Sequence, residues 1–155
     1  MRRNYPEKHD KVYFMGTCLA DMLYAEAGMA GIRLLEREGV KVIYPSDQTC
    51  CGQSAFYSGF QEEALKVALH QIHCFPKAYP IVVPSGSCGS MMVRHYPELF
   101  EGHPLEQKVI EFSSRIFELS EFLHHVLKIS LKDRGVPVKV TWHTSLSLIH
   151  ISEPT

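Results

Sequence analysis

Short apolar runs alternate with longer amphipathic segments along the chain. The run 11–16 is largely apolar and closes on a glycine, which predicts a strand buried on both faces of a sheet. Further runs at 40–44, 81–83 and 136–142 predict a second, a third and a fourth strand. The apolar pattern therefore places strands along most of the chain.

Between the strand runs, apolar residues recur at intervals of three and four, as they do on one face of a helix. The first such segment starts at Leu19 and is closed by Gly39, which predicts a helix of about 18 residues. Segment 54–72 predicts a second helix capped by its first serine. Segments 91–93 and 113–126 predict two more helices.

The order of these elements predicts an α/β fold with an open, mostly parallel sheet of about four strands and flanking helices. Parallel strands joined by right-handed crossovers place every strand-to-helix loop at the same edge of the sheet. We expect residues 11–143 to form one domain, because 155 residues suit a single core and no long linker interrupts the pattern.

Four of the five cysteines lie in loops that follow predicted strands, and open α/β sheets build their sites at that edge. Cys74 instead lies within the predicted helix 54–72, and we expect it to be a core or partly exposed residue. Four thiolates match the ligand count of an iron–sulfur cluster or of a tetrahedral zinc ion. The candidate ligands are Cys18, Cys50, Cys51 and Cys88.

Two other kinds of site compete with the iron–sulfur hypothesis. Structural zinc usually takes its cysteines in pairs spaced two to four residues apart, and the vicinal pair Cys50–Cys51 fits that geometry poorly. Thiol redox chemistry at the same pair favours a basic environment, and residues 45–65 hold no lysine or arginine. Among nine histidines, only His95 and His143 lie near the expected site.

Charge and cysteine usage restrict the partners and the compartment. The sequence has 16 Lys and Arg against 17 Asp and Glu, so it carries no basic patch for nucleic acid or for an anionic membrane surface. Its opening residues lack the apolar segment of an export signal, and no run is long enough for a membrane span. We therefore expect a cytoplasmic protein with reduced thiols.

Three short stretches surround the four cysteines: Gly16-Thr17-Cys18-Leu19-Ala20-Asp21-Met22, Thr49-Cys50-Cys51-Gly52-Gln53 and Pro84-Ser85-Gly86-Ser87-Cys88. In residues and spacing they resemble a known family, the cysteine-rich CCG domain found in heterodisulfide reductase. Within it, the sequence is similar to the N-terminal half of the lactate utilization protein A family. Met91 stands where the fullest family motif has a further cysteine, which excludes a five-cysteine cluster.

The resemblance implies a [4Fe–4S] cluster held by Cys18, Cys50, Cys51 and Cys88. It further implies an oxidoreductase subunit that passes electrons within a multisubunit complex oxidising L-lactate to pyruvate. Partner subunits would then handle the small-molecule substrate, and no catalytic residue is identified in this chain. Within the same family, subunits of heterodisulfide reductase-like, glycolate or glycerol-phosphate oxidoreductases are alternatives.

The last ten residues, 146–155, look like a translated sequencing adapter, and we exclude them from the fold. On this interpretation the sequence is an N-terminal fragment of a protein with two CCG motifs. We expect such a fragment to leave apolar surface uncovered and to self-associate.

Overall fold

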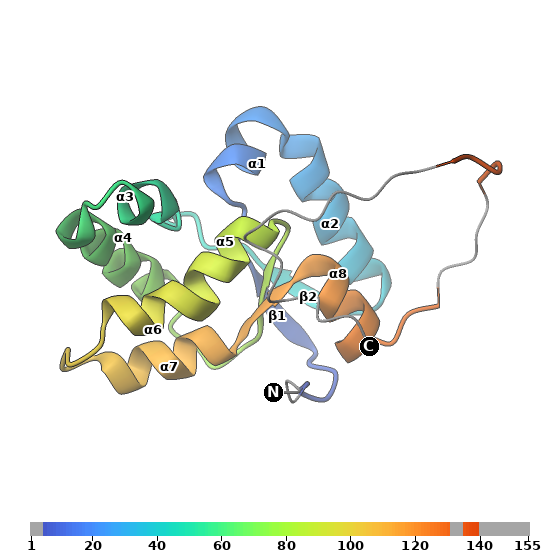
Figure 1. Cartoon of the computed structure of the whole chain (residues 1–155). Helices are drawn as coiled ribbons and strands as arrows, with labels where there is room; N and C mark the ends of the chain where they lie inside the picture. The colour runs from blue at the N-terminus through green and yellow to red at the C-terminus, as the bar shows by residue number, and fades with distance from the viewer. Residues whose placement is uncertain (1–4, 131–134, 140–155) are drawn as a thin grey trace.

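Four short strands form one all-parallel sheet in the computed structural model, which describes residues 5–130 and 135–139 (Figure 1). The sheet order is β2-β1-β3-β4, and the sheet confirms the predicted α/β class. Tyr13 pairs with Ile43 on one side and with Ile81 on the other, so β1 lies inside the sheet. The strands are β1 (Lys11–Phe14), β2 (Lys41–Ile43), β3 (Ile81–Val83) and β4 (Ile116–Glu118).

Helices cover both faces of this sheet, which gives three layers (Figure 1). One face carries α2 and the segment from α8 to η2, and the other carries α4 and the run from α5 to α7. The helices are α1 (Cys18–Leu23), α2 (Ala25–Arg37), α3 (Gln53–Tyr57), α4 (Gln61–Cys74), α5 (Gly86–Ser90), the π-helical turn η1 (Met91–His95), α6 (Tyr96–Leu99), α7 (Glu106–Ser114), α8 (Leu119–Glu121) and the π-helical turn η2 (Phe122–Val126).

Strand β1 explains why the core has two halves. Successive side chains of a strand point to opposite faces. Val12 and Phe14 accordingly pack into one core cluster, whereas Tyr13 and Met15 pack into the other. All four are buried, so the predicted burial of this strand on both faces is confirmed.

The predicted single helix after β1 is two helices, because Tyr24 between them adopts the non-helical φ of −136°. Helix α1 buries none of its residues, whereas α2 packs against the sheet through Leu35. The helix predicted over 54–72 is also divided, at Gly59 with its φ of +83°. Apolar spacing alone did not separate these pieces, because each pair of helices continues the same spacing.

The fourth strand lies at 116–118, where the sequence predicted helix, and this prediction was wrong. Ile116 and Phe117 are buried in opposite core clusters, which a strand achieves with consecutive residues. The next helix starts only at Leu119, behind a capping box made by Glu118 and Glu121.

The strand predicted over 136–142 is absent from the part of it that is described. Residues 136–139 lie outside the sheet, and the side chains of Val136 and Val138 are 78% and 69% exposed. Residues 140–142, the predicted domain end at 143 and the tail 146–155 lie outside the described residues. Within the described residues, no helix has the length and apolarity to cross a membrane.

Candidate metal centre

The sheet order brings the cysteine loops together. The chain runs from β1 to β2 on one side of β1, and it then crosses back to β3 on the other side of β1. At the carboxyl edge of the sheet, the connections after β1 and β3 therefore lead away in opposite directions. Open α/β sheets bind their ligands at such a switch point. Cys18 follows β1 and Cys88 follows β3, while Cys50 and Cys51 follow β2.

Side-chain contacts join the four thiols in two pairs. The Cys18 and Cys50 sulfurs are 3.7 Å apart. Cys51 and Cys88 share a hydrogen bond deeper in the molecule, where their exposed fractions are 2% and 8%. Cys18 is exposed and Cys50 is partly buried. The site therefore has an outer pair, Cys18 with Cys50, and an inner pair, Cys51 with Cys88.

The pairing can be compared with the geometry around a single metal ion. A tetrahedral zinc ion lies about 2.3 Å from each sulfur, so all four sulfurs must surround one point. Across residues 5–130 and 135–139, no three His, Cys, Asp or Glu side chains are grouped to hold one metal ion. The Cys18–Cys50 separation of 3.7 Å is also the distance between two sulfurs that each lie about 2.3 Å from one tetrahedral zinc ion, so the pairing by itself does not separate zinc from a cluster.

Protons are divided unequally between the inner thiols. The hydrogen bond from Cys51, with those from Ser85 and Ser87, lowers the pKa of Cys88 to about 7 against burial, which acts in the opposite direction. The same hydrogen bond to Cys88, with burial, raises the pKa of Cys51 far above its ordinary value. Cys88 is therefore the first thiolate, and Cys51 keeps its proton until a metal displaces it.

The outer thiol of Cys18 is less acidic than an ordinary cysteine. Burial raises the pKa of Cys18, and the hydrogen bond with Cys50 adds to the effect. A metal group that binds here must displace the proton from Cys18, so its binding becomes tighter as pH rises.

Backbone geometry on either side of the cysteines is unusual. Thr17, buried directly before Cys18, has a φ of +57° with a ψ of 142°, which side chains disfavour, and its hydroxyl accepts a hydrogen bond from the amide of Ala20. Gly52, directly after Cys51, has a φ of +80° and begins α3. At Thr17, strain of this kind persists only where the surroundings enforce it, so the start of the Cys18 loop is held in place. Gly52 adopts its positive φ without strain, because glycine has no Cβ atom.

The side chain of Tyr96 contacts the loop that carries Cys50 and Cys51. Its buried hydroxyl donates a 3.0 Å hydrogen bond to the carbonyl oxygen of Cys51. Burial and the nearby Cys51, Cys50 and Cys88 raise the pKa of Tyr96, so the hydroxyl stays protonated and remains a donor. The amide of Tyr96 bonds to the carbonyl of Met91, five residues earlier, which is the π-helical turn that precedes Pro97.

Several residues that hold the loops carry no signal in the sequence. Gln53 donates a 3.3 Å hydrogen bond to the carbonyl of Ser87, joining the Cys51 loop to the Cys88 loop. Glutamines are ordinary surface residues, and only the folded chain shows which of them are enclosed. The other residues in this group are Gln48, Gln71 and Tyr96.

The remaining candidates lie in the following places. Met91 is fully buried in the same core cluster as Cys51 and Cys88. His95 contacts the Tyr57 hydroxyl at 3.0 Å and the Glu98 carboxylate at 2.7 Å, on the outer side of η1. Cys74 is partly exposed on α4, as predicted, and His143 lies outside the described residues.

Comparison with known proteins gives a family and a set of relatives. The CCG family, described as a cysteine-rich domain, matches residues 12–93. A protein of Halalkalibacterium halodurans named lactate utilization protein A is 39% identical over 142 residues, which cover 91% of this chain and 58% of the relative. Proteins of the same name are 39% identical in Geobacillus kaustophilus, where 59% is covered, and 41% identical over 140 residues in Shouchella clausii, where 58% is covered.

The coverages show how much of this chain and of its relatives the similarity includes. The chain spans somewhat under three fifths of the length of these relatives, while about nine tenths of the chain itself is covered. No solved structure matches the chain.

Proposed function

Since the chain belongs to the CCG cysteine-rich domain family, we propose that it is the cluster-binding part of an iron–sulfur electron-transfer subunit. Cys18, Cys50, Cys51 and Cys88 are its ligands, and the cluster is [4Fe–4S]. The observation that carries this proposal is the meeting of four thiols from three loops at one edge of the sheet, in two contacting pairs.

The number and chemistry of the donors fit such a cluster. Four cysteine thiolates are the usual ligands of a [4Fe–4S] cluster. When bound, the cluster accepts and donates electrons. The chain's own residues would hold it, exclude water on the inner side through the buried Cys51 and Cys88, and maintain the loops through Gln53 and Tyr96.

The pathway is proposed from the relatives. They are named lactate utilization protein A, and we propose that the whole protein passes electrons within a complex that oxidises L-lactate to pyruvate. Oxidation of lactate to pyruvate removes two electrons, which such a subunit would pass on one at a time. Other subunits would bind lactate, so this chain alone is expected to oxidise none.

Two other functions are less well supported. Structural zinc usually takes its cysteines in pairs spaced two to four residues apart, and the vicinal pair Cys50–Cys51 departs from that spacing, which counts against a zinc-stabilised interaction module. A thiol redox protein requires an attacking thiolate that its partner can reach, and Cys88, the thiol whose pKa is lowered to about 7, is only 8% exposed.

Metal analysis of the 155-residue chain, purified without oxygen, tests the proposal. We expect brown protein with broad absorbance at roughly 400 nm, from thiolate-to-iron charge transfer. Iron and acid-labile sulfide should be present in equal amounts. Stoichiometric zinc without sulfide would support the interaction module, and protein that takes up neither metal would leave the thiol redox function.

A further inference from the structure

We propose that Gln48 and Gln71 are positioning residues that hold the Cys50–Cys51 loop in place. Their side-chain amides make the hydrogen bonds that main-chain amides of a neighbouring strand would otherwise make. Each side-chain amide bonds to both an N–H and a C=O group of the main chain, in the manner of a neighbouring strand. The thiols therefore meet whether or not a metal group is bound.

Gln48 continues the sheet where β2 has ended. The amide of Met15 bonds to Val82 on the β3 side, so the Phe14 carbonyl and the Gly16 amide face the opposite side, toward β2. Strand β2 stops at Ile43 and leaves these two groups without strand partners.

The Gln48 side chain occupies that place. Its oxygen accepts from the Gly16 amide at 2.9 Å, and its nitrogen donates to the Phe14 carbonyl at 3.3 Å. This is the arrangement in which one residue of a parallel strand bonds to two residues of its neighbour. Gln48 thereby ties its own loop to the end of β1, from which Cys18 follows.

Gln71 holds the same loop from the other side. It is fully buried on α4, and its oxygen accepts from the Thr49 amide at 2.9 Å while its nitrogen donates to the Thr49 carbonyl at 3.3 Å. One amide thus bonds both polar groups of a single residue, as in a hydrogen-bonded antiparallel pair. Thr49 directly precedes Cys50, so the pair of cysteines starts from a fixed point.

Together, the two glutamines fix residues 48 and 49 relative to β1 and to α4. A buried amide without hydrogen-bond partners is unfavourable, so the fully buried Gln71 keeps its two bonds to Thr49. The loop therefore has one favourable position, in which Cys50 lies 3.7 Å from Cys18. An apolar side chain of the same length in place of Gln48 would release this connection.

Thiol–disulfide equilibrium measures this placement without any metal. The metal-free, full-length chain is equilibrated with glutathione and its disulfide, and the Cys18–Cys50 disulfide is quantified by tandem mass spectrometry. Two protein thiols give two electrons and two protons to glutathione disulfide, which becomes two glutathione thiols. The equilibrium constant reports the effective concentration of one thiol at the other.

The matched variants are Gln48→Met and Gln61→Met. Gln61 is exposed, and its amide donates only to the nearby Phe56 carbonyl. We expect Gln48→Met to lower the equilibrium constant about tenfold, as the loss of two hydrogen bonds implies, and Gln61→Met to leave it unchanged. An unchanged constant in folded Gln48→Met protein would overturn the proposal.

A second variant covers the case in which Gln48→Met does not fold. Gln71→Met acts on the same loop, and its constant is expected to fall by a similar factor. If neither variant folds by circular dichroism, the amides are required for the fold itself, and the positioning role is wrong.

The consequence for a bound cluster rests on the proposed function, whereas the glutathione measurement does not. In cluster-loaded protein, we expect Gln48→Met to lose its visible absorbance to a chelator several times faster than Gln61→Met. Wild-type protein that binds no cluster would overturn the proposed function and leave the thiol result standing.

Discussion

The sulfur atoms of Cys18 and Cys50 lie 3.7 Å apart, although the two residues are 32 positions apart in the chain. One belongs to the loop after β1 and the other to the loop after β2, so the sheet itself brings them together. The inner pair, Cys51 with Cys88, comes from the loops after β2 and β3, the two strands that lie on either side of β1. Substitution of any one of the four cysteines should therefore weaken metal binding, because the other three cannot replace the lost ligand.

We expect Cys50→Ser and Cys51→Ser to abolish cluster binding, because a serine hydroxyl is a poor ligand for iron in this setting. Cys74→Ser is the matched control, since Cys74 lies on α4 and bonds to the His70 carbonyl instead. Iron and sulfide per chain, measured after anaerobic purification, check this prediction. Equal loss of iron in Cys74→Ser would show that the ligand assignment is wrong.

Gly52 and Gly59 form a second matched pair. Both have positive φ values, of +80° and +83°, so an alanine at either position should destabilise the chain by about 1–2 kcal/mol. Only Gly52 adjoins Cys51, and a Cβ atom there would lie 3.4 Å from the Val67 side chain, whereas the space around Gly59 is open.

We therefore expect similar losses in urea unfolding for Gly52→Ala and Gly59→Ala, with reduced cluster content in Gly52→Ala alone. Full cluster content in Gly52→Ala would mean that the loop tolerates a shift at this point.

The stability of the metal-free chain should depend on pH through the inner thiols. The pKa of Cys88 falls from its ordinary 9.0 to about 7 in the folded chain, so its contribution is complete above pH 9 and is lost as pH falls through 7. The pKa of Cys51 is raised, so its contribution is complete below pH 9 and is lost above it. Unfolding free energy should rise from pH 7 to 9 and then decline.

Urea titrations from pH 7 to above pH 9 test whether the unfolding free energy first rises and then declines. Ser85→Ala removes a hydrogen bond that lowers the pKa of Cys88, so the rise should become smaller. Ser54→Ala, on α3, is the control and should keep the wild-type profile. A stability that falls steadily from pH 7 to 9 in the wild type would contradict this proton arrangement.

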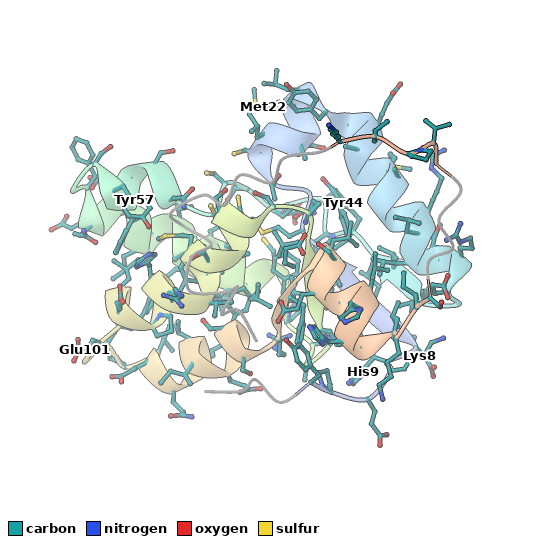
Figure 2. The ribbon with its side chains drawn as sticks, turned by 45° about the vertical axis from the view of Figure 1, so that its right-hand side comes forward. Lys8, His9, Met22, Tyr44, Tyr57 and Glu101 are labelled. Atoms are coloured by element: carbon teal, nitrogen blue, oxygen red, sulfur yellow. The ribbon has the colours of Figure 1, made fainter. Side chains whose placement is uncertain are left out.

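Helix α1 should make the chain self-associate. None of its residues is buried, and Leu19, Met22 and Leu23 are 61%, 79% and 66% exposed beside Cys18. Met22 points outward from the molecule (Figure 2). An apolar cavity of about 430 Å³, lined partly by Ala20, Met29 and Ile32, opens next to it. Apolar surface of this kind is usually covered by another polypeptide.

Light scattering after size-exclusion chromatography measures the association. We expect Met22→Lys combined with Leu23→Lys to shift the chain toward the monomer, and Ile110→Lys on α7, where Ile110 is 42% exposed, to have little effect. A wild-type chain that is monomeric at high concentration would contradict the prediction.

The sequence was sufficient for the parts of the fold that repeat a simple pattern. The strand at Lys11–Phe14 is apolar in its last three residues because it is covered on both faces, and few elements besides a buried strand have that composition over so short a run. The strand at Ile116–Glu118 was missed because three residues cannot display a period, and the helical spacing of Leu119, Phe122 and Leu123 extends back to Ile116.

The candidate site was likewise predictable from the sequence only in part. Cysteines are rare and their loops follow strands, so the edge of the sheet at which the four cysteines lie could be predicted, while their role as ligands stays a prediction. Gln48, Gln71 and Tyr96 could not be predicted, because their partners are main-chain groups of Phe14, Thr49 and Cys51, and a main-chain group leaves no mark in the sequence.

The central position of β1 also sets an order of events during synthesis. Both of its sheet partners come later in the chain, and the last thiol, Cys88, follows β3. A ribosome must therefore complete at least the first 88 residues, and the three strands must pair, before four thiols share one edge. The contact between Cys18 and Cys50 needs only β1 and β2, so the outer pair can form before the inner pair does.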